Sequence, residues 1–146
     1  PRWSTLLQAL MDIGNFSQKA GAWLAAKTGA ESGEVMKGLI DALPAHHLCI
    51  DFDPAELVIN GHSPTDSMKA LKEHVISFRA RDAVTDLSIG RGVEVQLGRG
   101  SVDWASLLGS LEEQSYSGFL TVQRGEGTEP IRECTEAMEF LTNMFR

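Results

Sequence analysis

Short apolar runs alternate with segments of helical periodicity along the chain. Apolar residues recur at helical spacing after Ser4, which predicts a capped helix that ends near Gly21. Four further segments predict helices: Glu34–Leu43, Thr65–His74, Trp104–Tyr116 and Pro130–Phe145. Four apolar runs between them predict strands: Ala22–Ala26, Leu48–Phe52, Val75–Ala80 and Phe119–Val122. The predicted order is one helix followed by four strand–helix units.

The predicted strands lack the alternation of apolar and polar positions that a half-exposed strand shows. Buried strands separated by helices are typical of a parallel sheet in an α/β protein. Right-handed crossovers place every helix on one side of such a sheet, which then curls into part of a barrel wall. Four strands make half a wall, with two open edges and an inner face that we expect to be apolar. A doubly wound open sheet, with helices on both faces, is the alternative architecture.

The longest stretch without a clear pattern is Asp82–Gly100, which contains one short extended piece at Val93–Leu97. It is too long for an ordinary connection, so we expect a loop that covers or contributes to a site. Its glycines do not form the GxxxxGK(S/T) phosphate loop, and the chain has no GxSxG or HExxH motif. We expect His46 and His47 in a surface or bottom loop.

Length and charge narrow the class of protein. The 146 residues are the size of one domain, so we expect residues 1–146 to form a single domain. Thirteen Lys and Arg against twenty Asp and Glu give a net charge of -7, which disfavours a nucleic-acid partner. No apolar run is long enough to span a bilayer, and no signal-peptide pattern opens the chain. We expect a cytoplasmic protein with no membrane partner.

Two details concern the termini and the thiols. The chain starts at Pro1 without an initiator Met, so we expect that residues upstream have been removed. Cys49 and Cys134 lack CxxC spacing, so we expect buried free thiols rather than a metal or redox site.

Several segments carry a family resemblance. Asp51–Leu57 (DFDPAEL), Leu97–Trp104 (LGRGSVDW) and Tyr116–Gln123 (YSGFLTVQ) resemble the FDPANL, LGxGxVDW and YxGxLTVE segments of the xylose isomerase-like barrel superfamily. Phe78–Asp82 stands where that family has a His-x-Lys-Asp strand end. The superfamily includes sugar-phosphate isomerases and epimerases and the second family of apurinic endonucleases. The resemblance implies the C-terminal half of a (β/α)8 TIM barrel, with strands five to eight and about five helices.

The resemblance also implies a metal site. Members bind one divalent metal, such as Mn, Mg, Co or Zn, through a Glu, an Asp, a His and a Glu at four strand ends, and the two Glu move protons. The corresponding residues here are Lys27, Asp53, Arg79 and Gln123. Only the Asp is retained, and protonated Lys or Arg offers no lone pair to a cation. We therefore expect no metal cofactor and no catalytic residue of the family type.

Two interpretations of the replaced residues remain open. Lys27 and Arg79 could supply the positive charge that neutralises Asp53 and Glu56. Alternatively, the strand ends bind an anionic sugar-like ligand, since Arg can hold a phosphate or carboxylate in bidentate fashion. The residues that would bind this ligand are Lys27, Asp53, Arg79, Arg81 and Gln123.

The sequence thus predicts a sugar isomerase/epimerase-like module that is non-catalytic on its own. The alternative is an active metal-dependent sugar (phosphate) isomerase or epimerase, completed by an N-terminal half or a partner chain that rebuilds a site around Asp53, Glu56 and Asp82. A third interpretation is a stable fragment with no separate function. Open strand edges also predict a homo-oligomer, such as a dimer, or a missing N-terminal half barrel.

Overall fold

The computed structural model of the chain describes residues 2–86, 88, 91–125 and 127–145. Its main sheet has four parallel strands in the spatial order β1-β2-β3-β6. These strands are β1 (Ala25–Lys27), β2 (Cys49–Phe52), β3 (Val75–Ala80) and β6 (Leu120–Val122). The helices are α1 (Arg2–Lys19), α2 (Gly33–Asp41), α3 (Pro54–Ile59), α4 (Pro64–Leu71), α5 (Trp104–Glu113) and α6 (Pro130–Met144). The strand order follows the sequence, as in a singly wound barrel wall, which confirms the predicted parallel sheet.

Most element boundaries differ from the predicted ones by one to three residues, and two differences lie at the strand ends. The first strand begins at Ala25 rather than Ala22 and includes Lys27. The segment after Asp53, for which the sequence predicted neither a helix nor a strand, forms the short helix α3, because Asp53 caps it and Pro54 occupies its first turn. The Asp53 carboxylate accepts a hydrogen bond from the backbone N–H of Glu56 at 3.1 Å. A helix therefore starts directly after β2, where the sequence predicted none.

The helix-covered face of the sheet holds the core. Ile50, Phe52 and Phe78 are fully buried on this face. The rings of Phe52 and Phe78 stack with their centroids 5.4 Å apart. The ring of Phe78 meets that of Trp104 of α5 edge to face, with the centroids 6.1 Å apart. Burying an aromatic or branched side chain of this kind contributes about 1.5–3 kcal/mol each. These contacts fix α5 against β3 and orient the strands.

The other face of the sheet corrects our expectation of an apolar inner surface. Side chains alternate along a strand, so the residues between the core positions point away from the helices. On β2 and β3 these include Asp51, Ser77 and Arg79. Arg79 donates across the strands to Asp51, which confirms that the two share this face. The inner face is therefore polar where it was predicted to be apolar.

The long irregular stretch is folded around Asp82. It contains a small antiparallel hairpin, β4 (Asp82–Val84) and β5 (Val93–Val95), while residues 87, 89 and 90 lie outside the described residues. The Asp82 carboxylate accepts hydrogen bonds from backbone or side-chain N–H groups of Ala83, Gly98, Gly100, Val102 and Trp104. A buried carboxylate with five donors is well satisfied. The Leu97–Trp104 segment is thus held against the end of β3.

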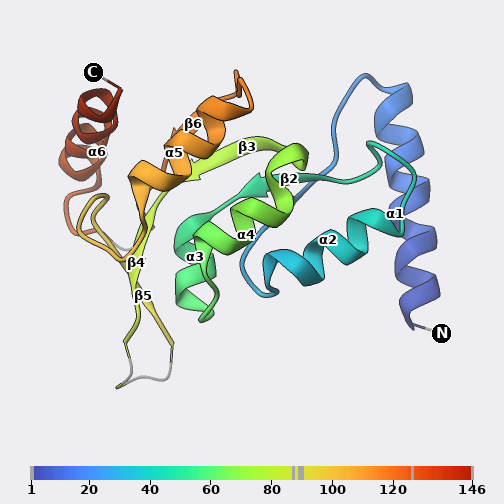
Figure 1. Cartoon of the computed structure of the whole chain (residues 1–146), viewed down its shortest axis with the longest axis horizontal. Helices are drawn as coiled ribbons and strands as arrows, with labels where there is room; N and C mark the ends of the chain where they lie inside the picture. Colours follow the sequence, from blue (N-terminus) through green and yellow to red (C-terminus); the bar gives the residue numbers. More distant parts are fainter. Residues whose placement is uncertain (1, 87, 89–90, 126, 146) are drawn as a thin grey trace.

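The ends of the molecule differ from its middle. Helix α1 lies at one end and α6 at the other, with the sheet and the remaining helices between them (Figure 1). Each outer strand, β1 and β6, has a single neighbour in the sheet. None of the helices in the described part of the chain is long and apolar enough to cross a membrane.

Candidate functional site

The carboxyl ends of the parallel strands bring together a set of charged side chains. Lys27 ends β1, Asp53 follows β2 and Arg81 follows β3. Arg81 Nη1 donates to Asp53 Oδ2 at 2.7 Å and to Glu56 Oε1 at 3.0 Å. Lys27 Nζ lies 3.7 Å from Asp53 Oδ2 and 3.2 Å from Glu56 Oε1. Two cations therefore share two carboxylates at the place where the sequence predicted the site.

The network continues across the other half of the sheet. Arg81 Nη2 donates to Glu94 Oε2 of β5 at 3.2 Å. Glu94 Oε1 lies 3.3 Å from Arg124 Nη1, and the backbone N–H of Gly125 donates to the same carboxylate. Arg124 Nε donates in turn to Glu133 of α6 at 2.5 Å. Acids and bases alternate from β1 to α6, so the strand ends are tied together by charge.

A second ion pair lies on the inner face. Arg79 Nε donates to Asp51 Oδ2 at 2.7 Å, and Arg79 Nη1 donates to Gln123 Oε1 at 2.8 Å. The other carboxylate oxygen of Asp51 is buried and has no hydrogen-bond partner in the described structure. Arg79 therefore neutralises Asp51 rather than Asp53, which differs from the pairing that the sequence suggested.

The ion pairs shift the pKa values of their members. Burial favours the neutral form of Glu56 and of Glu94, but the hydrogen bonds and positive charges around each carboxylate, those of Arg81 first, together outweigh burial and lower both pKa values. Burial likewise opposes the charge of Arg81, but its hydrogen bonds to Glu94 and Asp53 hold its pKa above the ordinary value. These groups are charged at neutral pH and stabilise one another.

Neither a protein-family model nor a curated protein matches the chain. Among solved structures, a xylose isomerase domain protein from Planctomyces limnophilus matches 99% of this chain and 52% of its own, with 28% identity and a TM-score of 0.86. A D-tagatose 3-epimerase-like protein matches with 16% identity and a TM-score of 0.79, over 98% of this chain and 54% of its own.

A third structure is a xylose isomerase-like TIM barrel protein from Mycobacterium smegmatis in complex with magnesium. It matches 97% of this chain and 50% of its own, with 13% identity and a TM-score of 0.77. The chain spans about half the length of each of these proteins. This chain has the fold of half a xylose isomerase-like TIM barrel.

The half barrel brings together the five residues that the sequence selected for ligand binding, in two neighbouring groups. Lys27, Asp53 and Arg81 form one, and Arg79 with Gln123 forms the other. Asp82, which the alternative interpretation placed in a rebuilt site, instead directs its carboxylate to the Leu97–Trp104 segment. Its side chain is buried and fully engaged, so it does not belong to the strand-end cluster.

Sequence reasoning missed four charged members of the half barrel: Asp51, Glu94, Arg124 and Glu133. Asp51 could have been found, because it lies two residues before Asp53 and strand alternation places both on the same face. Glu94 lies in the short extended piece predicted at Val93–Leu97, but nothing in the sequence indicated which residue it would contact. Arg124 and Glu133 follow the last strand, and only the tertiary fold brings them to Glu94.

Two other predictions concern residues away from this cluster. His47 lies in the loop before β2 as expected, but its side chain is buried against Gly14 of α1 rather than on the surface. Both cysteines are free: Cys49 is buried as predicted, whereas Cys134 is only partly buried.

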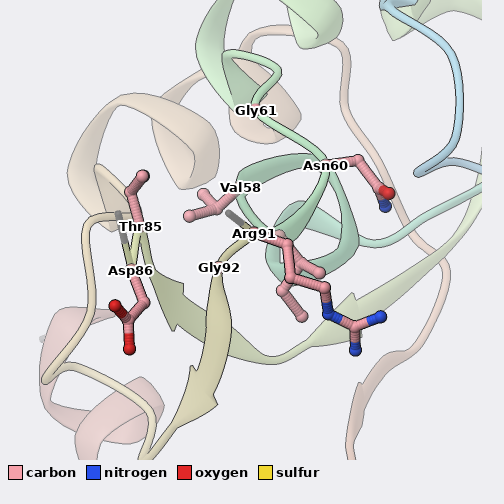
Figure 2. A pocket seen from close by; sticks show the side chains of 8 residues that line it. Val58, Asn60, Gly61, Thr85, Asp86, Arg91 and Gly92 are labelled. Atoms are coloured by element: carbon pink, nitrogen blue, oxygen red, sulfur yellow. The ribbon is translucent and has the colours of Figure 1, made fainter. Parts of the chain in front are cut away.

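A separate cavity of about 290 Å³ lies between the end of α3 and the β4–β5 hairpin. Figure 2 shows Asn60 and Gly61 on the α3 side, with Thr85, Asp86 and Arg91 contributed by the hairpin. None of the strand-end charged residues lines it. The cavity is therefore distinct from the site that the fold positions.

Proposed function

We propose that this half barrel is a non-catalytic module related to sugar isomerases and epimerases, in which ion pairs take the place of a metal ion at the strand ends. The neighbours include a D-tagatose 3-epimerase-like protein and a protein in complex with magnesium. The observation that carries the proposal is the engagement of Asp53. One of its carboxylate oxygens accepts the Glu56 N–H, and the other contacts Arg81 and Lys27.

A divalent cation does not fit these residues. Hard cations bind carboxylate, carbonyl and water oxygens, whereas a protonated Lys or Arg repels them. An ion at Asp53 would lie beside the ammonium of Lys27 and the guanidinium of Arg81. Among the described residues, no group of three or more His, Cys, Asp or Glu is arranged to hold a metal ion. We infer that the chain uses no metal cofactor.

Proton transfer of the family type has no suitable group either. The amide of Gln123 cannot accept a proton near neutral pH, and its oxygen already accepts from Arg79. Lys27 serves as the cation in ion pairs with Asp53 and Glu56. Neither residue can replace the carboxylates that resemblance assigns to these positions, which supports a structural role.

Thermal unfolding with Mn²⁺, Co²⁺ and Mg²⁺ tests the proposal. A ligand that binds only the folded state raises the melting temperature, so we expect no rise at about 1 mM metal for the wild-type chain. The triple variant Lys27→Glu, Arg79→His, Gln123→Glu restores the family ligand types, and we expect its melting temperature to rise with Mn²⁺. A rise in the wild type that Asp53→Asn abolishes would contradict the proposal.

An anionic carbohydrate is the second candidate, because the side chains of Lys27 and Arg79 are 43% and 33% exposed. Against it, the three cations of the network, Lys27, Arg81 and Arg124, face four carboxylates. Calorimetric titration with fructose 6-phosphate and with fructose distinguishes an anion-binding role of the strand ends from a purely structural one. Binding of fructose 6-phosphate but not of fructose, lost in the variant Lys27→Gln, would favour the anion-binding role.

The remaining alternative is an active isomerase or epimerase completed by another half barrel. It would need carboxylates from that other half, since Asp82 is committed to the Leu97–Trp104 segment and Glu56 is paired with Arg81. Metal binding by the wild-type chain in the presence of such a half, but not alone, would support this alternative instead.

A further inference from the structure

Asn60 and Gly61 form the only Asn-Gly pair in the sequence. In such a pair the backbone nitrogen of the glycine can attack the side-chain amide carbon of the asparagine, because glycine has no Cβ to shield that nitrogen. The other asparagines, Asn15 and Asn143, are each followed by a large side chain. Asn60 is therefore the asparagine of this chain that is most open to attack by its own backbone.

The pair lies at the end of α3, on one wall of the cavity between α3 and the β4–β5 hairpin (Figure 2). Both residues are exposed. No atom lies within 4 Å of the position that a Cβ would take at Gly61. The pair is thus open to water and to dissolved base.

The backbone turn that ends α3 engages the attacking nitrogen. Gly61 has a φ of 79°, and its N–H donates to the carbonyl oxygen of Val58 at 3.0 Å. The N–H of His62 donates to the carbonyl oxygen of Leu57 at 2.8 Å. These two bonds form the glycine-terminated turn that commonly ends helices. While the turn is closed, the Gly61 nitrogen keeps its proton in a hydrogen bond.

The closed turn also misplaces the two reacting groups. Asn60 has a ψ of 10°, so the Gly61 nitrogen nearly eclipses the backbone nitrogen of Asn60 and not its Cβ. Attack requires a rotation of roughly a third of a turn about the Asn60 Cα–C bond, which brings that nitrogen to the Cβ side. The Asn60 side chain is held as well, because its Nδ2 donates to the carbonyl oxygen of Glu56 at 2.8 Å. The turn must therefore open before the groups can react.

We propose that Asn60–Gly61 is a site of spontaneous covalent modification, which the closed turn at the end of α3 keeps unreacted. When the turn opens, the Gly61 nitrogen loses its proton to solvent base and bonds to Cγ of Asn60. The Cγ–Nδ2 bond breaks, and the amide leaves as ammonia. Water then cleaves one of the two C–N bonds of the imide ring, which leaves an aspartyl or an isoaspartyl residue at position 60. The inference does not depend on the proposed function.

The product weakens the end of α3. A carboxylate at position 60 cannot donate to the Glu56 carbonyl, and it adds negative charge at the negative end of the helix. The isoaspartyl form also lengthens the main chain by one carbon atom. Ile59, the last residue of α3, accepts the Gly92 N–H of the hairpin at 2.9 Å. Modification at position 60 therefore loosens the contact between α3 and the hairpin.

Incubation in oxygen-labelled water at mildly alkaline pH, followed by peptide mass spectrometry, tests the site. In the urea-unfolded chain we expect Asn60 to convert at least about tenfold faster than Asn15 and Asn143, because only Asn60 precedes a glycine. In the folded chain, the conversion of Asn60 should be slowed at least as much as hydrogen exchange of the Gly61 amide, since both need the turn to open. Equal rates for the three asparagines in urea, or a smaller slowing in the folded chain, would overturn the proposal.

The variant Asn60→Asp measures the effect of the product directly. We expect its Gly61 and Gly92 amides to exchange at least about tenfold faster than those of the wild type, because the bond to the Glu56 carbonyl is lost. Asn143→Asp is the matched control, since it makes the same change at an exposed position near the end of α6. It should leave both amides unchanged. Unchanged exchange of the Gly61 amide in Asn60→Asp would show that the Asn60 amide does not hold the turn, and would overturn the proposal.

Discussion

Arg81 Nη1 lies 2.7 Å from Asp53 Oδ2, and the two side chains are 9% and 0% exposed. This buried pair joins the end of β3 to the end of β2. Arg81 also reaches Glu56 and Glu94, so one guanidinium holds three carboxylates from different elements. Arg81, rather than Lys27 or Arg79, is therefore the central cation of the strand ends.

Replacing Arg81 should strongly destabilise the half barrel. Arg81→Met leaves the buried carboxylates of Asp53 and Glu94 without their main partner, and breaking a buried pair in this way costs about 3–5 kcal/mol. The free energy of unfolding in urea measures the effect. Arg132→Met is the control, because Arg132 forms only exposed pairs on α6, which contribute about 1 kcal/mol or less. Equal losses in both variants would contradict a central role for Arg81.

Stability should decline in acid. The pKa of Glu94 is lowered in the folded state, because the hydrogen bonds from Arg81, Gly125 and Arg124 and the charge of Arg81 together outweigh the effect of burial. Its contribution to stability is complete above its ordinary pKa of 4.5 and is lost as the pH falls through the lowered folded value. Glu56 acts in the same direction. Melting temperatures from pH 7 to pH 3 should therefore be level at first and then fall below about pH 4.5.

The variant Glu94→Gln identifies the source of that acid sensitivity. It removes the titrating group, so its melting temperature should be lower at pH 7 but should fall less steeply in acid than that of the wild type. A wild-type melting temperature that rises as the pH falls from 5 to 3 would contradict the assignment.

Asp82 should be essential for the order of the Leu97–Trp104 segment. Asp82→Asn replaces one acceptor oxygen by an amide NH2 group, itself a donor, which would face the donors of Gly98, Gly100 or Trp104. Leaving such buried groups unsatisfied should cost about 2–4 kcal/mol, read from urea unfolding. Asp103→Asn is the matched control, because Asn caps a helix about as well as Asp and Asp103 only caps α5.

Two glycines should respond in opposite directions to alanine. A Cβ at Gly100 would lie 1.9 Å from Asp82 Oδ1 and 2.6 Å from the carbonyl oxygen of Ala83, so Gly100→Ala should displace the segment and lower the melting temperature by several degrees. Gly109 lies in α5 with no atom within 4 Å of a Cβ. Gly109→Ala should stabilise the chain by up to about 1 kcal/mol. Thermal unfolding of the two variants side by side is the measurement.

The sequence alone determined the parallel sheet and all of the helices around it except α3. Apolar runs separated by helical periodicity are local signals. Lys27, Asp53, Arg79 and Gln123 were instead selected through the family resemblance, and the structure has each of them near the carboxyl end of a strand. The short helix α3 was missed because its signal, Asp53 and Pro54 before a buried turn, also suits a loop.

The partners of the charged residues were decided only by the tertiary structure. Arg79 turned to Asp51 and Arg81 to Asp53, although Arg79 and Arg81 belong to the same strand end and both could reach an acid in principle. Glu94 of β5 meets Arg124 and Gly125, which follow β6, although about thirty residues separate them along the chain. A cation pairs with whichever carboxylate the register and the connections bring within a few ångströms, and neither composition nor spacing along the chain encodes that distance.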